Sequence, residues 1–319
     1  MKNKKKLSPV IQFALTVLLI ALVYVIIQLM MNSKIINRYY SGILISICIN
    51  VILVVSLNIT TGFLGQLTLG HAGFMAIGAY VAAFLTKEVF SIAGPVDFIL
   101  ATLIAGVVAM VFGVIICLPT LRLKGDYLAI ITLACGEVIK NILLNLDITG
   151  GASGYIGIPR YTNFAFAYIF AIITVYATYA LIKSRFGRVV MAVRDNEIAA
   201  ESSGVNINRV KMLAFVFAAF FAGVAGSLYA HYIGILEPKI FDFDKSIEIL
   251  VMVVLGGMGS IKGSVIAAVV LTVLPEMLRG ADNLRMLIYA LSLIIIMLFK
   301  YSPTLSSFIN RFRRKEKVS

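Results

Sequence analysis

Long apolar runs dominate the chain and determine the expected fold. Runs of about 17–25 apolar residues recur along almost the whole length, and a bilayer core takes about 20 residues per helix. They predict spans at 9–31, 41–58, 66–86, 97–118, 127–146, 164–183, 212–233, 247–259, 264–279 and 284–300. A soluble fold with one very large core would leave too little polar surface to cover it. The pattern predicts an all-α integral membrane protein, a polytopic bundle of about ten transmembrane helices in a single domain over 1–319, with some helices short or broken.

The two short spans near the end of the chain decide the predicted topology. Glycines 256, 257, 259 and 263 and the lone Lys262 interrupt the apolar pattern there, which favours two helices over one. With ten spans and the N-terminus inside, most of the 28 lysines and arginines lie on the inner side. Nine spans would place the basic tail 301–319 outside. We therefore expect both termini to be cytoplasmic, together with the basic segment 1–8 and the loop 184–211.

Composition supports a membrane location and argues against a nucleic-acid-binding protein and against a disulfide or metal framework. The chain is 61% hydrophobic and 13% charged, with a mean hydropathy of +0.99. The net charge of +13 could indicate nucleic-acid binding, but the basic residues lie between apolar runs and at both ends, as in cytoplasmic loops. The apolar run after Lys6 is too long for a signal peptide, so we expect an uncleaved anchor helix. The three cysteines form no disulfide or metal pattern.

A glycine-rich segment at 61–80 places polar groups within a predicted span. Five glycines lie between positions 62 and 78, and small residues let helices approach closely in lipid. Gln66, Thr68 and His71 must face the bundle interior or a water-filled path. Two interpretations stay open: a segment that lines a translocation path, or a tightly packed helix whose polar groups bond to neighbours.

A carboxylate is predicted near the middle of the fifth span. Asp126 is a suitable N-cap for this helix, and Glu137 follows about 16 Å further along at 1.5 Å per residue. A mid-membrane carboxylate needs a partner, which Lys140 or Asn141 can supply from the same face. An internally paired acid is favoured over a group in the path, because a proton relay would usually show more acids. Thr132, Glu137 and Asn141 complete the candidate path residues.

The outer segment 149–159 contains four glycines and a proline. This composition predicts a shaped turn rather than a helix. Its candidate contact residues are Thr149, Gly150, Gly151 and Gly154. The turn could meet a soluble partner on the outer face or simply connect two spans.

The longest polar segment between spans is 184–211. Asp195 and Asn196 can cap a helix and Gly204 can end it, which predicts a short amphipathic helix. A helix this short is marginal alone in water, so it would dock in a groove of another protein. An ordinary solvated loop is the alternative that the residues alone favour. Gly257 to Ser264 lacks the P-loop pattern, and two isolated histidines do not suggest a metal site, so we expect no nucleotide, cofactor, metal or catalytic site in the chain.

Taken in order, these motifs resemble the branched-chain amino acid ABC transporter permease family, specifically its M-type subunit. The similarity covers about residues 40–280. It lies in the runs Gly62 to Tyr80, Leu121 to Leu133, Thr149 to Pro159, Arg185 to Ala200 and Val254 to Gly263. Cys135 departs from the pattern, since related chains often have an aromatic residue there.

The resemblance implies that 194–204 is the coupling helix that docks on an ATP-hydrolysing subunit. The implied coupling residues are Arg185, Gly187, Arg188, Arg194, Asp195, Asn196, Glu197, Ala200 and Gly204. It also implies a bacterial cytoplasmic membrane, a second homologous permease, two ABC ATPases that use the ATP, and an extracytoplasmic protein that delivers leucine, isoleucine or valine. No nucleic-acid partner is implied. The alternatives are an ABC permease for urea, short amides or a sugar, and an ion-coupled secondary transporter.

Overall fold

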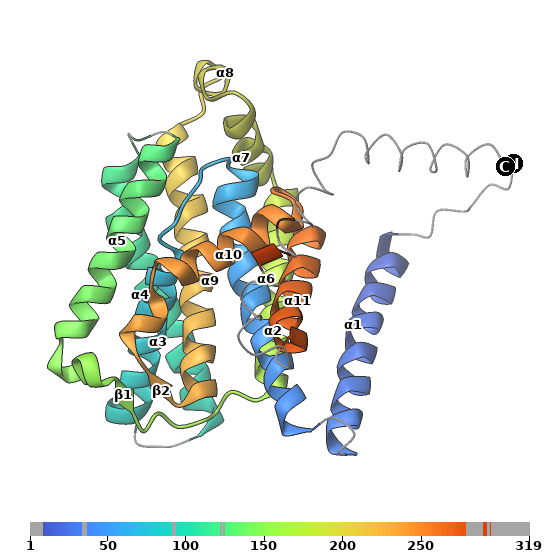
Figure 1. Cartoon of the computed structure of the whole chain (residues 1–319). Helices are drawn as coiled ribbons and strands as arrows, with labels where there is room; N and C mark the ends of the chain where they lie inside the picture. Colours follow the sequence, from blue (N-terminus) through green and yellow to red (C-terminus); the bar gives the residue numbers. More distant parts are fainter. Residues whose placement is uncertain are drawn as a thin grey trace, which may run out of the picture.

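The computed structural model describes residues 9–33, 37–90, 94–121, 123, 125–278, 290, 291 and 294. In these ranges the protein is a bundle of helices (Figure 1). Its helices are α1 (Pro9–Asn32), α2 (Arg38–Asn58), α3 (His71–Phe84), α4 (Pro95–Thr120), α5 (Asp126–Asn145), α6 (Phe164–Lys183), α7 (Arg185–Asp195), α8 (Glu197–Ser202), α9 (Ile207–Ile233), α10 (Phe243–Gly256) and α11 (Ile261–Met277). The strands β1 (Tyr155–Ile156) and β2 (Ile235–Leu236) pair antiparallel.

Six of the described helices are long and apolar enough to cross a membrane. They are Arg38–Phe63, His71–Val89, Pro95–Thr120, Asp126–Asn145, Phe164–Lys183 and Ile207–Ile233. The first two include π-helical turns, Ile59–Phe63 at the end of α2 and Leu85–Val89 at the end of α3. The all-α membrane fold is therefore confirmed. The predicted tenth span 284–300 lies outside the described residues except for 290, 291 and 294, as do the basic ends 1–8 and 301–319.

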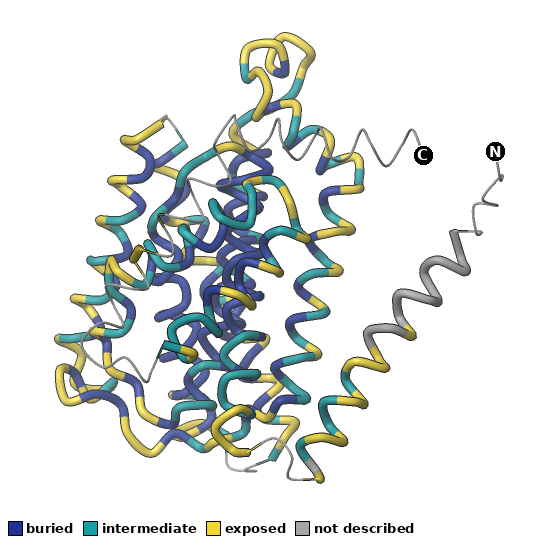
Figure 2. The backbone as a smooth tube through the Cα atoms, turned by 45° about the vertical axis from the view of Figure 1, so that its right-hand side comes forward, coloured by how far each residue is buried: buried dark blue, intermediate teal, exposed yellow. Residues whose placement is uncertain are grey.

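Helix α9 is the centre of the bundle and packs against α2, α3 and α4. Figure 2 shows the buried backbone concentrated in the middle of the bundle, with α1 standing at its edge. Small residues allow the closest of these contacts: a Cβ atom on Gly78 of α3 would overlap the carbonyl oxygen of Gly223 on α9. Gly226, one turn further along α9, meets the carbonyl oxygen of Met75 in the same way. In lipid the hydrophobic effect does not drive helices together, so they associate through close van der Waals packing, which small residues allow.

The predicted helix at 66–86 is wrong at its start. Residues 64–70 are not helical, and α3 begins only at His71. Gly65 has φ +77°, a left-handed conformation that a residue with a side chain adopts at a cost. The backbone therefore turns at this glycine instead of continuing as a helix, and a hydropathy pattern cannot detect such a turn within an apolar segment.

The predicted break between the two short spans is confirmed. α10 ends at Gly256 and α11 begins at Ile261, so 247–279 is two helices. Gly257 and Gly259, with φ of +98° and +77°, make the turn between them. Gly256 and Gly263 lie against each other, because a Cβ atom on Gly256 would stand 2.7 Å from the carbonyl carbon of Gly263.

A glycine-to-alanine pair tests the packing of the bundle centre. Gly78→Ala places a methyl group on the backbone of α9 and is expected to destabilise the protein by about 1–3 kcal/mol, the usual cost of overpacking a core. The measurement is thermal unfolding of the purified protein in detergent.

Gly136→Ala is the matched control. This glycine is also helical and buried, but the nearest atom to an added Cβ is the Cα of Gly70 at 3.5 Å, an ordinary contact. Equal stability of the two variants would contradict the proposed close approach of α3 and α9.

Candidate functional site

The non-helical segment 64–70 runs back into the bundle along α2. The amide of Gln66 donates to the carbonyl oxygen of Thr60 at 2.9 Å, and the Thr68 and Thr60 hydroxyls are 3.2 Å apart. Further in, His71 Nε2 lies 2.9 Å from Ser56 Oγ. Thr68 and His71 are buried and Gln66 is half-buried. α3 therefore starts level with Ser56, about two turns inside the end of the preceding helix.

The same segment is packed against α5 on its other side. The amide of Leu69 donates to Thr132 Oγ1 at 3.0 Å. Gly70 faces the Thr132 carbonyl, and Gly73 lies against Gly136 with no room for a side chain. The predicted polar residues Thr68, His71 and Thr132 are thus brought together between α2, α3 and α5, and each has a hydrogen-bond partner within the bundle.

Asn58, the last residue of α2, bonds to the second break in the bundle. Its Oδ1 accepts a hydrogen bond from the Gly259 amide at 2.9 Å, and its Nδ2 donates to Ser264 Oγ at 2.8 Å. The side chain is 1% exposed. One buried amide on α2 therefore bonds both to the turn between α10 and α11 and to the first turn of α11. The spacing of the motifs gave no sign of this contact.

Arg194, near the end of α7, touches both breaks. A Cβ atom on Gly65 would stand 2.7 Å from Arg194 Cγ, and one on Gly259 would stand 3.5 Å from Arg194 Nη1. The guanidinium is also held by the neighbouring Asp195, with Nε–Oδ1 and Nη2–Oδ1 distances of 3.0 and 2.8 Å. The segment between α6 and α9 therefore lies beside the two places where the helices are interrupted.

The polar segment forms two helices rather than the single short helix predicted. Ser184 caps α7 by accepting from the Gly187 amide at 3.2 Å, and Asn196 caps α8 by accepting from the Ala199 amide at 3.0 Å. Asp195 is the last residue of α7, not a cap. Gly204, with φ +83°, follows the end of α8 as predicted. Asp126 is likewise the first residue of α5, and its side chain makes no cap, because Gly125 holds the N-cap position.

The nine predicted coupling residues have different environments. Gly187 and Ala200 are buried, and Gly187 lies against the backbone of Ile182. The remaining side chains are exposed apart from that of Glu197. They are Arg185, Arg188, Arg194, Asp195 and Asn196, with Gly204 also exposed. Ile198 was not among the predicted residues, yet it lies on α8 and is 78% exposed. α8 projects from the end of the bundle (Figure 1).

Glu197 points inward and pairs with a buried lysine. Lys211 Nζ lies 2.5 Å from Glu197 Oε1, and the side chains are 4% and 27% exposed. An ammonium group buried to this extent requires an opposite charge. The pair therefore fixes α8 to the first turns of α9, which belongs to the bundle centre.

The outward face of α5 carries polar side chains. Lys140 pairs with Glu137, as predicted, while the Asn141 side chain donates to the Glu137 carbonyl at 2.9 Å rather than to its carboxylate. Asn145 repeats this bond one turn later, donating to the Asn141 carbonyl at 2.8 Å. Sequence reasoning missed Asn145, although its i+4 spacing from Asn141 places it on the same face.

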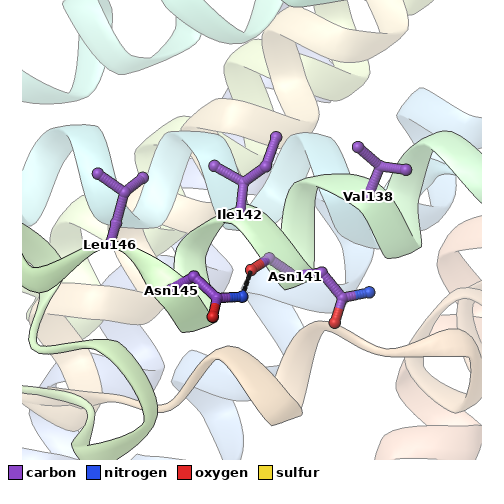
Figure 3. A pocket seen from close by; sticks show the side chains of 5 residues that line it. All are labelled: Val138, Asn141, Ile142, Asn145 and Leu146. Atoms are coloured by element: carbon purple, nitrogen blue, oxygen red, sulfur yellow. Dashed lines mark hydrogen bonds between the residues drawn. The ribbon is translucent and has the colours of Figure 1, made fainter.

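These asparagines line an open hollow of about 460 Å³. Figure 3 shows Val138, Ile142 and Leu146 along one edge of it and the two amides along the other. Exposed amides are costly against lipid tails, so polar groups in a membrane helix face a protein partner or a water-filled path. Because Asn145 is the last residue of α5, the polar part of this face lies at the end of the span.

The outer segment forms the predicted turn, but it includes a 3-10 helical turn at Gly151–Ser153 and the strand β1. Gly150, Gly151 and Gly154 all have positive φ, and Gly154 lies against the carbonyl of Leu236 next to the pairing of β1 with β2. Thr149 Oγ1 donates to the Leu146 carbonyl at 2.9 Å. Burial of Tyr155, beside the Glu88 carboxylate, raises the pKa of this tyrosine to about 12. The hydroxyl therefore stays protonated and donates to Glu88 Oε1 at 3.3 Å.

A bundle of apolar helices of which six are long enough to cross a membrane defines a multi-pass membrane protein. The family profile of the branched-chain amino acid transport system permease component matches residues 39–299. The chain belongs to this family. No solved structure matches it.

The curated relatives are permease proteins for branched-chain amino acids or, in one case, for ribose. The chain is 35% identical to the high-affinity branched-chain amino acid transport system permease protein LivM of Escherichia coli, over 79% of this chain and 66% of that one. It is 34% identical to a probable LivM of Methanocaldococcus jannaschii over 52% and 51% of the two chains. The ribose import permease protein RbsC of Haemophilus influenzae is 26% identical over 73% and 72%. The chain thus spans just under two thirds of the length of the Escherichia coli relative.

The Glu197–Lys211 pair gives an asymmetric prediction for stability. Glu197→Gln leaves the buried lysine without its opposite charge and is expected to cost roughly 3 kcal/mol. Lys211→Met leaves only a half-buried carboxylate that reaches water, and is expected to cost clearly less. The measurement is thermal unfolding of each variant in detergent.

The double variant Glu197→Gln/Lys211→Met is the control for the pair. It is expected to be more stable than Glu197→Gln alone, since no unpaired buried charge remains. Additive losses in the double variant would show that the two side chains do not interact.

Proposed function

We propose that the chain is the substrate-translocating permease subunit of an ABC importer for branched-chain amino acids in a bacterial cytoplasmic membrane. The observation that carries this proposal is the contact of Arg194 with both helix breaks, because it links the exposed projection to the interior of the bundle. The family membership and the LivM relatives support the substrate class. The prediction of both termini in the cytoplasm follows from the basic residues at the two ends.

ATP would be bound by partner subunits and not by this chain. Two ABC ATPases would bind on the side of α7 and α8, with one of them receiving α8 and its exposed Ile198. Movement of α8 reaches α9 through the Glu197–Lys211 pair and reaches both breaks through Arg194. A ligand changes a conformational equilibrium only by binding one state better, and ATP binding between the two ATPases supplies that difference.

A second, homologous permease would cover the outward face of α5. The path would then run between the two chains, beside the hollow at Asn141 and Asn145. This hollow combines amide groups with the side chains of Val138, Ile142 and Leu146. The amides suit the charged ends of an amino acid and the apolar edge suits a branched side chain. An extracytoplasmic binding protein would deliver the substrate near the loop at 149–154 and its exposed Gly150.

The second candidate is an ABC permease for a sugar, which the 26% identity to RbsC favours. Both candidates are tested by uptake into proteoliposomes that contain the chain, its homologous permease, the two ATPases and the binding protein. We expect ATP-dependent accumulation of leucine without an ion gradient. Uptake of ribose instead would select the sugar permease, and uptake driven by an ion gradient without ATP would refute both.

The α5 hollow predicts a specific transport defect. Asn141→Leu and Asn145→Leu are each expected to lower leucine uptake roughly tenfold, the value of one hydrogen bond to a charged group. The measurement is the initial rate of uptake in the reconstituted complex. ATPase subunits should stay bound, since α5 lies away from α8.

Ile173→Leu on α6 serves as the control because this side chain is 48% exposed on a helix with apolar surroundings. Its uptake should equal that of the parent protein. Full transport by both asparagine variants would exclude this face from the path.

The projection predicts a separate defect in assembly. Ile198→Asp is expected to release the ATPase subunits, because an apolar anchor in an interface is typically worth about 2 kcal/mol or more. Thermal stability of the isolated chain should not change, since the side chain is 78% exposed. The measurement is retention of the ATPases on the affinity-purified permease.

Asn208→Asp introduces the same charge at an exposed position in the first turn of α9. It should retain the ATPases. If Ile198→Asp also retains them, α8 is not the docking element.

A further inference from the structure

A hollow of about 550 Å³ lies at the end of the bundle opposite α7 and α8. It is formed where three elements meet: the start of α2, the segment that leads into α6, and the end of α9 (Figure 1). Its lining residues are Arg38, Gly42, Ile45, Arg160, Thr162, Asn163, Tyr232 and Ile233. Because three membrane helices begin or end at this level, the hollow lies at the boundary between membrane and water.

The hollow is positively charged. Arg38 and Arg160 both line it, and none of the eight lining residues is acidic. The Arg160 guanidinium is held in place by a bond from Nη2 to the Ile233 carbonyl at 3.0 Å, which leaves its other N–H groups for a ligand. Among the described residues, neither arginine forms an ion pair. Glu276 is engaged by the hydroxyl of Tyr39 and does not line the hollow.

Uncharged groups of the same hollow suit an anion. Tyr232, Thr162 and Asn163 place side-chain hydroxyl or amide groups among the lining residues, though the Thr162 hydroxyl is already bonded to the Leu228 carbonyl at 2.9 Å. α2 and α6 both start beside it, and neither N-cap side chain bonds to the first turn. The free amides of two helix N-termini add positive potential to that of the arginines.

The surroundings of the hollow favour an amphiphile over a soluble anion. Tyr39 and Tyr40, next to Arg38, are 43% and 56% exposed, as aromatic residues at a membrane boundary commonly are. α6 leaves the hollow with Ile169 and Ile173 exposed, which offers apolar surface for an acyl chain. The hollow lies on α2, α6 and α9, whereas the proposed path is beside α5 on another side of the bundle (Figure 1).

We propose that this hollow binds the phosphate group of an anionic phospholipid, with Arg38 and Arg160 as its two cationic ligands. The bound headgroup would join the starts of α2 and α6 to the end of α9 and place one negative charge between the two arginines. Arginine suits this role because its planar guanidinium binds phosphate oxygens in pairs. The proposal requires the membrane location but does not depend on what the protein transports.

The test compares lipids on the full-length chain. The protein is reconstituted in nanodiscs of phosphatidylcholine alone or with phosphatidylglycerol, and lipid retained after transfer to detergent is measured by native mass spectrometry. We expect selective retention of phosphatidylglycerol and a higher unfolding temperature in its presence. Retention of the two lipids in proportion to their supply would overturn the proposal.

Variants locate the bound lipid. Arg38→Gln and Arg160→Gln are each expected to weaken retention of phosphatidylglycerol roughly fivefold, and the double variant roughly thirtyfold, as for loss of one and two basic residues at an anionic surface. The control Arg209→Gln/Lys239→Gln removes the same charge at exposed positions away from the hollow and should keep the selectivity. Equal losses in the control and the double variant would place the lipid elsewhere and overturn the proposal.

Soluble ligands distinguish the source of the anion and need no variant. Inorganic phosphate and leucine are added to the parent protein in phosphatidylcholine nanodiscs. Neither is expected to raise the unfolding temperature as phosphatidylglycerol does. Equal stabilisation by phosphate would make this a site for a free anion, and stabilisation by leucine would make it a substrate site; either result contradicts lipid binding.

Discussion

Backbone groups that leave a helix inside a bilayer must find hydrogen-bond partners in the protein, because lipid offers none. Two segments of this protein meet that constraint, at 64–70 and at 257–260. Thr60 and Thr132 accept hydrogen bonds from amides of the first, and Asn58 accepts one from the Gly259 amide of the second. These amides are bonded within the protein, although Met258 of the second segment is 55% exposed. The breaks exist because α2 and α5 carry the polar side chains that satisfy them.

Close helix packing is what makes room for these breaks. Gly70 and Gly73 let the start of α3 approach the backbone of α5, and Gly78 lets its middle approach α9. Backbone contacts of this kind are stiff, since interiors packed to this density pass a displacement on rather than absorb it. A movement of Arg194 at the end of α7 would therefore reach both Gly65 and the turn at Gly259. The exposed projection, the breaks and α5 form one contiguous set of contacts.

The charged groups of the protein follow the same logic at its two ends. On one side, buried Lys211 holds α8 to the bundle through Glu197. On the other, Arg38 and Arg160 line a hollow with no acidic residue. Between them, the amides of Asn141 and Asn145 remain on the outward face of α5. We propose that another molecule covers each of these polar surfaces: a second permease subunit at α5 and a lipid headgroup at the arginines.

Sequence periodicity and composition alone predicted the all-α membrane fold, the approximate limits of most of its described spans, the break at 256–263 and the pairing of Glu137 with Lys140, and the ordered motifs added the permease family. These features depend on local spacing and on the length of apolar runs, which are written directly in the chain. Only the tertiary structure placed the start of α3 at His71, turned Glu197 inward toward Lys211 and brought Arg194 to Gly65 and Gly259. Such contacts join residues far apart in sequence or depend on a single backbone turn. Hydropathy averages over a window of neighbouring residues, so it cannot predict either of them.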